Sequence, residues 1–191
     1  MTYSQYSPRP LRVFNIYSGI GGFELGMKLA CDRFSLPYEI VGLCEKDPYC
    51  RQVLSLRFPG VPIFEDATSL TRQSLSAVGV TNIDILTASP PCQPFSKAGR
   101  RKGGADDRDL FPHTIGLLGE LQPRLAVFEN VRGLLSIEKG EYFKQTLRQI
   151  AQVGYDALWQ TISCASLGGV HKRERLFVIC THSNHEFAIA S

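Results

Sequence analysis

The sequence contains no apolar run that approaches the length needed to cross a bilayer. Its first ten residues are polar, carry two prolines and have no apolar core of the kind found in secretory signals. These absences exclude an obvious membrane span and an obvious targeting segment. We therefore expect a soluble protein without a membrane partner, in which residues 1–10 form a flexible N-terminal arm.

The sequence also lacks the cysteine patterns of structural zinc sites and disulfide scaffolds. No two cysteines form a Cys-x-x-Cys pair, and their spacing shows no regular framework. We therefore expect no bound metal, reduced thiols and a location in the cytoplasm. The six cysteines are Cys31, Cys44, Cys50, Cys92, Cys164 and Cys180.

A strong excess of charge of one sign is absent as well. The formal net charge is +3 and the pI is about 8.5, which permits a polyanionic partner such as DNA without requiring one. A chain of 191 residues, 43% hydrophobic and 20% charged, suits one domain with a substantial core. We expect this domain over residues 11–181, followed by a C-terminal tail over residues 182–191.

Short apolar, β-branched runs alternate with segments of helical periodicity along the whole chain. This alternation predicts an α/β fold with a doubly wound, mostly parallel sheet. The expected strands cover 11–17, 38–44, 61–64, 83–88, 124–128, 155–163 and 176–180, and the expected helices cover 23–30, 48–58, 110–121 and 141–153.

One stretch carries the strongest chemical signal. The expected strand over 83–88 is followed by Pro90 and Pro91, and then by Cys92. Prolines cannot continue the hydrogen-bond ladder of a sheet, so the thiol is expected just past the carboxyl end of the strand. Ligands bind at that edge of open parallel sheets, which makes Cys92 a candidate nucleophile. A buried structural thiol is the alternative, but a segment this rich in proline is a poor core segment.

A glycine-rich turn over 18–22 separates the first expected strand from the first expected helix. Such a turn lets the backbone approach a ligand at the helix start, although a tight connection alone would also explain it. Glu45 strengthens the ligand interpretation, because it follows the second strand, where an acid can accept hydrogen bonds from ribose hydroxyls. Glu65 and Asp66 follow the third strand and suit either an adenine amino group or a helix cap.

Three other features carry charge. The stretch 97–109 clusters positive charge without apolar periodicity, which suits phosphate contacts or a solvated loop equally well. Glu129 follows an expected strand, where it could act on a substrate ring or cap the next segment. Arg173 and Arg175 share one side of an extended segment, so both could face one anionic group, with a surface salt bridge as the alternative.

Together these motifs resemble those of the S-adenosylmethionine-dependent DNA cytosine-5 methyltransferases. They follow the order of that family over residues 11–181, and several motifs together are far more specific than one. The resemblance implies a Rossmann-like fold and methyl transfer from S-adenosylmethionine to carbon 5 of cytosine in DNA. The matching stretches are Tyr17–Phe23, Glu45, Asp66, Pro91–Gln93, Arg108 with Leu110, Glu129–Val131 and Arg173–Arg175.

The resemblance also implies roles for single residues. Cys92 would add to carbon 6 of a cytosine flipped out of the duplex, Glu129 would act on the ring nitrogen, and Arg175 would contact the carbonyl oxygen. The catalytic candidates are Cys92, Glu129, Arg173 and Arg175. The cofactor-binding candidates are Tyr17, Ser18, Gly19, Ile20, Gly21, Gly22, Glu45, Asp66, Pro91 and Leu110. The DNA-binding candidates are Gln93, Ser96, Lys97, Arg100, Arg101 and Arg108.

The sequence departs from the family pattern in three ways. Tyr17 stands where Phe is usual, and Val170 with His171 replaces the commoner Pro-Gln. Family members normally continue into a target-recognition region, so we expect a region or second polypeptide outside these 191 residues to choose the DNA site. An RNA cytosine methyltransferase and a non-catalytic subunit that binds cofactor or DNA are the alternative functions. An NAD oxidoreductase is disfavoured, because the glycine pattern is incomplete.

Overall fold

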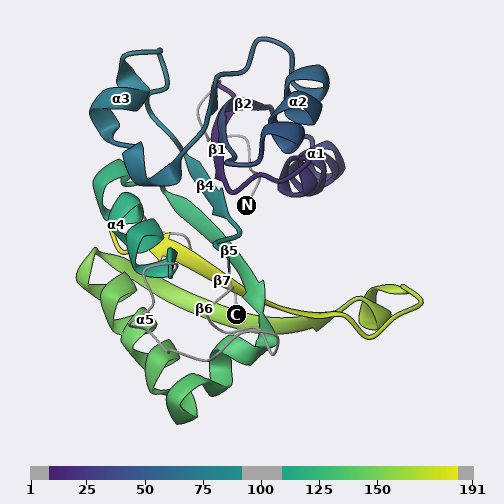
Figure 1. Cartoon of the computed structure of the whole chain (residues 1–191), viewed down its shortest axis with the longest axis vertical. Helices are drawn as coiled ribbons and strands as arrows, with labels where there is room; N and C mark the ends of the chain where they lie inside the picture. The colour runs from purple at the N-terminus through teal and green to yellow at the C-terminus, as the bar shows by residue number, and fades with distance from the viewer. Residues whose placement is uncertain (1–8, 92–108, 185–191) are drawn as a thin grey trace.

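Seven strands form one sheet in the computed structural model, which describes residues 9–91 and 109–184 of the chain. Their spatial order is β3-β2-β1-β4-β5-β7-β6 (Figure 1). Strands β1 to β5 run parallel to one another, whereas β7 runs antiparallel to its neighbours β5 and β6. This arrangement confirms the doubly wound, mostly parallel α/β fold predicted from the sequence.

The strands are β1 (Leu11–Ile16), β2 (Tyr38–Cys44), β3 (Ile63–Phe64), β4 (Ile85–Ala88), β5 (Leu125–Val131), β6 (Tyr155–Ser163) and β7 (Glu174–His182). The α-helices are α1 (Gly22–Phe34), α2 (Pro48–Arg57), α3 (Arg72–Ser76), α4 (Phe111–Leu121) and α5 (Glu141–Gln152). The 3-10 segments are η2 (Ala67–Ser69), η5 (Arg132–Gly140) and η6 (Ala165–Leu167). In the described ranges, no helix has the length and apolar character that a membrane crossing requires.

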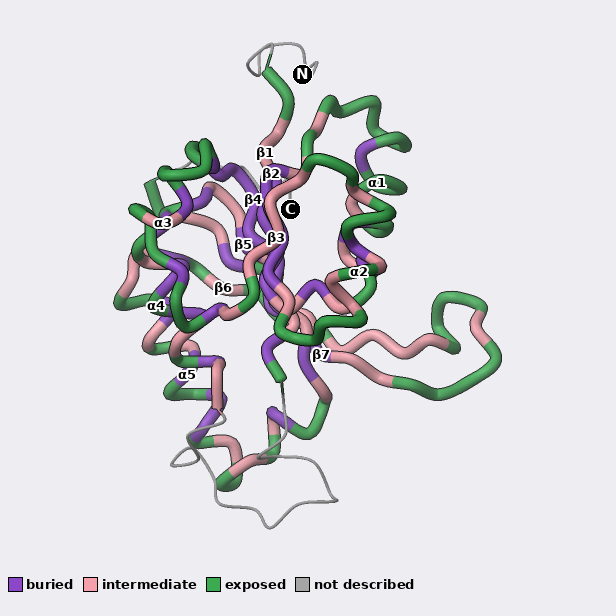
Figure 2. Tube along the Cα trace, turned by 45° about the horizontal axis from the view of Figure 1, so that its top comes forward, coloured by how far each residue is buried: buried purple, intermediate pink, exposed green. Residues whose placement is uncertain are grey.

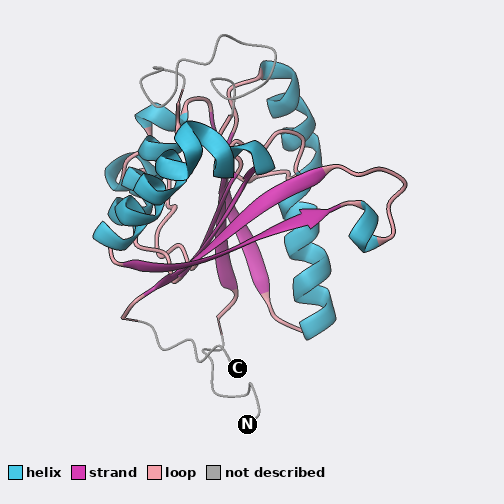
Figure 3. Ribbon diagram, turned by 90° about the horizontal axis from the view of Figure 1, so that it is seen from below, coloured by secondary structure: helices cyan, strands magenta, loops and turns pink. Residues whose placement is uncertain are grey.

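Helices cover both faces of the sheet (Figures 2 and 3). Figure 2 shows α1 and α2 on one side and α3, α4 and α5 on the other. The central strands are buried on both faces, so Val13, Phe14 and Leu86 are all 0% exposed. The main core lies between the sheet and α3 to α5, where Phe14 and Leu86 meet Leu118 and Phe128.

The face of the sheet that carries α1 and α2 is more exposed at the end formed by β5, β7 and β6. Side chains alternate along β5, so Ala126 and Phe128 are buried in the main core while Val127 faces the opposite side and is partly buried. Val127 pairs with Ile179, which pairs with Leu158 on β6. Ile179 and Leu158 are 42% and 54% exposed. We call Val127, Ile179 and Leu158 the open face.

Strands β6 and β7 extend past the other strands as a two-stranded arm, which projects to the right in Figure 1. The last pair of this arm joins Ser163 to Glu174, and η6 lies near its tip. Leu167 and Val170 near the tip are 77% and 102% exposed. The arm therefore presents its tip to solvent rather than to the core.

Arg9 ties the N-terminal segment to the sheet. Its guanidinium donates to both carboxylate oxygens of Asp84, at 2.6 and 2.8 Å, and Asp84 is 4% exposed. The same carboxylate accepts a hydrogen bond from the backbone N–H of Arg12 at 2.9 Å. The arm expected over residues 1–10 is therefore anchored at Arg9, and residues 1–8 lie outside the described part of the chain.

Glu45 joins two connections at the carboxyl edge of the sheet. Its Oε2 accepts a hydrogen bond from the N–H of Gly19 at 2.7 Å, and its Oε1 accepts one from the N–H of Asp47 at 2.8 Å. Asp47 in turn caps α2 by accepting a hydrogen bond from the N–H of Cys50 at 2.9 Å. One carboxylate thus holds the turn after β1 against the start of α2.

We predict that Glu45→Gln destabilises the fold. The amide oxygen can accept only one of the two backbone hydrogen bonds, and the amide NH2 group then faces a backbone N–H. An unsatisfied donor of this kind costs about 1–3 kcal/mol, which urea unfolding monitored by circular dichroism can measure.

Glu65→Gln is the matched control, because Glu65 also follows a strand and forms an ion pair. Its partner is Arg51 at 3.3 Å, and its side chain is 77% exposed. Exposed pairs contribute about 0–1 kcal/mol, so this variant should unfold close to the parent. Equal stability of the two variants would contradict the role of Glu45 in connecting the turn after β1 to the start of α2.

Candidate cofactor and catalytic site

A cavity of about 850 Å³ opens at the carboxyl edge of the parallel strands. The chain connects β1 to β2 on one side, and β4 lies on the other side of β1. Ligands bind at such a reversal of strand order because the two connections diverge there. The cavity brings together five of the predicted cofactor-binding residues from four strand ends and the start of α4. The lining residues are Tyr17, Cys44, Glu45, Lys46, Asp47, Pro48, Asp66, Ala67, Thr68, Ser89, Pro91 and Leu110.

The predicted glycine turn over 18–22 does not line the cavity, but it directly follows Tyr17, which does. Gly19 and Gly21 have φ angles of 54° and 93°, in the left-handed region that favours glycine. A Cβ on Gly21 would lie 2.9 Å from the ring of Phe58, so a larger residue does not fit. The N–H of Ser18 donates to the carbonyl of Cys44 at 3.0 Å and continues the pairing of β1 with β2 into the turn. The turn over 18–22 therefore has a fixed path beside Tyr17 and Glu45.

The two predicted acids lie in the same cavity. Glu45 holds two backbone N–H groups, and each of its oxygens has further lone pairs that can accept ligand hydroxyls. The backbone N–H and the hydroxyl of Thr68 both donate to Oδ1 of Asp66 at 2.8 Å, which lowers the pKa of Asp66. Asp66 therefore stays ionised at neutral pH. Asp66 caps η2, as one of the two interpretations predicted. It also lines the cavity, and contact with an adenine amino group stays a prediction.

Tyr17 and Leu110 are linked by a short chain of hydrogen bonds. The hydroxyl of Thr114 donates to the carbonyl of Leu110 at 2.7 Å, so the Tyr17 hydroxyl, 3.3 Å away, is the donor to Thr114. Burial raises the pKa of Tyr17 to about 12, and the phenol stays neutral at physiological pH. Tyr17, which lines the cavity directly after β1, is thereby connected to the first turn of α4.

These features fit an adenosyl group. The volume lies within the range of about 300–1,000 Å³ that is usual for small-molecule sites. Glu45 and Asp66 offer acceptors for hydroxyl and amino protons, while Pro91 and Leu110 offer apolar surface. Cys44 also lines the cavity, but burial raises its pKa to about 12, which makes this thiol a poor nucleophile.

A second group of charged residues lies at the end of β5. Arg175 Nε lies 2.6 Å from Glu129 Oε1. Because β7 is antiparallel to β5, its first residues meet the last residues of β5, and Arg175 is paired with Val131. Glu129 stands inside the strand and binds Arg175, so it does not cap η5. Arg173, predicted to face the same group, precedes β7 and is exposed.

Asn130 fastens the segment after β4 to β5. Its side chain is 5% exposed, and its Nδ2 donates to the carbonyl of Pro90 at 3.3 Å. Its Oδ1 accepts from the N–H of Val131 at 2.8 Å, which fixes the amide orientation. The double proline and the Glu129 carboxylate are therefore held at the same edge of the sheet.

Seven predicted site residues lie outside the described part of the chain. They comprise the candidate nucleophile and the six candidate DNA contacts: Cys92, Gln93, Ser96, Lys97, Arg100, Arg101 and Arg108. Within residues 9–91 and 109–184, no three His, Cys, Asp or Glu side chains are grouped so that they could hold a metal ion.

Several residues at or near the site were not predicted from the sequence. Four cavity residues lie within four positions after the predicted second, third or fourth strand, so this position was the available signal. They are Lys46, Ala67, Thr68 and Ser89. A polar residue within an apolar strand was the signal for Asn15, which donates to Glu24 Oε1 at 2.6 Å. Burial raises the pKa of Glu24, and this pair ties the first turn of α1 to β1.

The chain matches a family model described as C-5 cytosine-specific DNA methylase over residues 11–190. It is 34% identical to the type II methyltransferase M.NgoMIV of Neisseria gonorrhoeae, over 89% of this chain and 51% of that relative. It is 30% identical to the type II methyltransferase M.AquIA of a Picosynechococcus strain, over 88% of this chain and 71% of that relative.

A solved structure has the same fold. It is a prophage-encoded protein of E. coli, named as a DNA modification methyltransferase, with 25% identity and a TM-score of 0.73 over 90% of this chain and 47% of that one. The chain spans about half the length of M.NgoMIV and of this prophage protein. Because the family model covers nearly all of its 191 residues, the chain belongs to the C-5 cytosine-specific DNA methylase family.

Proposed function

We propose that this chain carries the catalytic centre of a DNA cytosine-5 methyltransferase, which transfers a methyl group from S-adenosylmethionine to carbon 5 of cytosine. One geometric observation carries the proposal. The cavity lies beside β1, and the Glu129–Arg175 pair lies at the end of β5. Strand β4 runs between β1 and β5, and its carboxyl end leads to Cys92 in the sequence. A methyl-donor site and a base-binding pair thus flank the nucleophile's strand.

The residues around the cavity would hold the methyl donor. Glu45 would accept the ribose hydroxyl protons, Asp66 would accept from the adenine amino group, and Leu110 would pack against the base. The start of α1 after the turn over 18–22 would attract a carboxylate group, since Gly21 at this helix start provides no side-chain cap and the positive end of the helix dipole lies there. When bound, S-adenosylmethionine supplies a methyl group on a positively charged sulfur, which a carbon nucleophile can displace.

The remaining chemistry makes cytosine such a nucleophile. The Cys92 thiolate would form a bond to carbon 6, and the electrons of the C5–C6 double bond would form the new bond from carbon 5 to the methyl group. The bond between that methyl group and sulfur would break, and its electron pair would stay on sulfur. Glu129 would hold a proton at ring nitrogen N3 while Arg175 orients Glu129 and the carbonyl oxygen. A base would then take the proton from carbon 5, the double bond would re-form, and the thiolate would leave. We place this reaction in the cytoplasm, where thiols stay reduced.

The target base must leave the duplex for this chemistry, which costs a few kcal/mol. Phosphate contacts would offset that cost, and they are assigned to positive and polar side chains near Cys92 in the sequence and to Arg173, just beyond the last strand pair of the arm. The side chains near Cys92 are Gln93, Ser96, Lys97, Arg100, Arg101 and Arg108.

We predict that Cys92 forms a covalent adduct with DNA that contains 5-fluorocytosine. Fluorine at carbon 5 cannot be removed as a proton would be, so the enzyme stays bound to the methylated base. Denaturing gel electrophoresis and peptide mass spectrometry with S-adenosylmethionine present would locate the adduct. Cys92→Ser should abolish it.

Cys50→Ser is the matched control, because Cys50 is a free, partly exposed thiol on α2. This variant should form the adduct as the parent does. An adduct on a residue other than Cys92, or one that survives Cys92→Ser, would contradict the assignment. Transfer to tRNA instead of DNA under the same conditions would favour the RNA alternative.

We further propose that the DNA sequence is chosen by a region outside these 191 residues, supplied by the same polypeptide or by a second one. The relative M.NgoMIV extends well beyond the matched part, since only 51% of it is covered. The open face offers an apolar surface that such a region could cover. Contacts to phosphates hold DNA without selecting a sequence, and base contacts are needed for selection.

This proposal predicts that the purified 191-residue chain does not confine methylation to one DNA site. Incubation with mixed-sequence DNA and S-adenosylmethionine, followed by bisulfite sequencing, would reveal every methylated cytosine. Methylation should be absent or spread over many sequence contexts. Efficient methylation restricted to one short sequence would show that the 191 residues suffice for recognition.

A further inference from the structure

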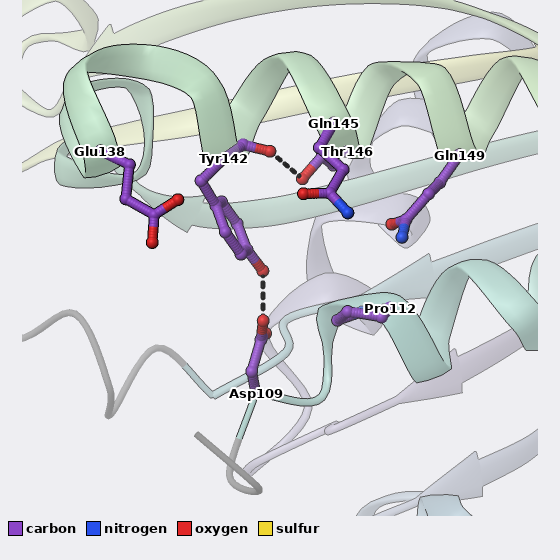
Figure 4. A pocket seen from close by; sticks show the side chains of 7 residues that line it. All are labelled: Asp109, Pro112, Glu138, Tyr142, Gln145, Thr146 and Gln149. Carbon is purple, nitrogen blue, oxygen red and sulfur yellow. Dashed lines mark hydrogen bonds between the residues drawn. The ribbon is translucent and has the colours of Figure 1, made fainter. Parts of the chain in front are cut away.

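The first turn of α4 is held by the carboxylate of Asp109. Its Oδ1 accepts a hydrogen bond from the N–H of Phe111, the first residue of the helix, at 3.1 Å. Its Oδ2 accepts a hydrogen bond from the hydroxyl of Tyr142 at 2.6 Å. Figure 4 shows Tyr142 reaching from α5 toward Asp109 across the gap between the two helices. One carboxylate therefore connects α4 to the first turn of α5.

Tyr142 is itself firmly placed. Its side chain is 6% exposed, and its carbonyl accepts a hydrogen bond from the hydroxyl of Thr146 at 3.0 Å within α5. A phenol that donates to a carboxylate forms a charge-assisted hydrogen bond, which is stronger than one between neutral groups. Tyr142 is therefore a rigid support that restrains Asp109.

Asp109 is directly followed by Leu110, which lines the cavity. The carbonyl of Leu110 accepts a hydrogen bond from the hydroxyl of Thr114, and that hydroxyl accepts one from Tyr17. Two tyrosines thus restrain the same helical turn, Tyr17 from the cavity and Tyr142 from α5. Leu110 lies between these two restraints.

We propose that Tyr142 is a positioning residue of the methyl-donor site, which acts through Asp109 to hold Leu110 against the ligand. This inference rests on the proposed function, because it takes the cavity to be the methyl-donor site. It adds a residue on α5 that does not line that cavity.

The alternative is that the Tyr142 hydroxyl contributes only to the stability of the fold. Tyr155 allows the two roles to be separated, because its hydroxyl donates to the carbonyl of Pro123 at 2.6 Å and its side chain is 1% exposed. Pro123 follows α4, so Tyr155 supports the opposite end of the same helix. Each Tyr→Phe change removes one buried hydroxyl and keeps the ring.

Tyr142→Phe should leave a folded protein. The hydroxyl borders a second cavity of about 260 Å³, lined by side chains that include Gln145 and Gln149 (Figure 4). This cavity is polar and large enough for water, which can hydrate Asp109 when the phenol hydroxyl is removed. The carboxylate then stays satisfied but is no longer attached to α5.

The test compares Tyr142→Phe with Tyr155→Phe in the full 191-residue chain. Titration calorimetry with S-adenosylhomocysteine should show affinity weakened on the order of tenfold for Tyr142→Phe and less than about twofold for Tyr155→Phe. Thermal unfolding should show similar losses for both. Unchanged affinity in Tyr142→Phe, or an equal loss in both variants, would overturn the proposal.

A double substitution tests whether Tyr142 acts through Asp109. Tyr142→Phe combined with Asp109→Ala should bind S-adenosylhomocysteine no more weakly than Asp109→Ala alone. A further loss on the order of tenfold in the double variant would show that Tyr142 acts independently of Asp109.

Hydrogen exchange gives a readout that does not depend on the cofactor. The amides of Phe111, His113 and Thr114 should exchange faster in Tyr142→Phe than in Tyr155→Phe, because only the former frees the start of α4. Equal exchange would overturn the positioning role. A parent chain that binds no S-adenosylhomocysteine but shows the expected exchange would instead refute the proposed function of the cavity.

Discussion

The candidate site depends on the reversal of strand order between β1 and β4. From β1 the chain builds outward through β2 and β3, and it then returns to form β4 on the other side. The connections after β1 and β4 therefore diverge at the carboxyl edge, and the side chains that follow the first four strands surround the space between them. Glu45 stabilises that edge, because its two oxygens accept hydrogen bonds from the turn after β1 and from the start of α2.

The direction of β7 gives the catalytic pair its geometry. An antiparallel strand brings its first residues to the last residues of its neighbour, so Arg175 reaches Glu129 although they lie 46 positions apart in the sequence. Asn130 then connects the end of β5 to Pro90, which follows the neighbouring strand β4 and precedes Cys92 in the sequence. In the proposed function, the acid, its arginine and the proline segment are thus positioned by two adjacent strand pairs.

Local patterns predicted much of this molecule. The bounds of β2 and β6 and the strand ends that precede Glu45 and Asp66 all depend on neighbouring residues, and the sequence shows these directly. The contacts between distant segments were not predictable in this way. The bond from Tyr142 to Asp109 spans 33 positions and that from Asn130 to Pro90 spans 40, and their existence depends on how helices and strands pack. β5 also proved longer than predicted, because pairing with β7 continues it through Val131.

The central claim is that the cavity at the strand reversal binds the methyl donor. A crystal structure of the chain with S-adenosylhomocysteine tests it most directly. The account predicts the nucleoside inside the cavity, with the ribose hydroxyls within hydrogen-bond distance of Glu45 and the adenine amino group near Asp66. A nucleoside bound elsewhere on the chain, or a ligand in the cavity whose ribose faces away from Glu45, would contradict it.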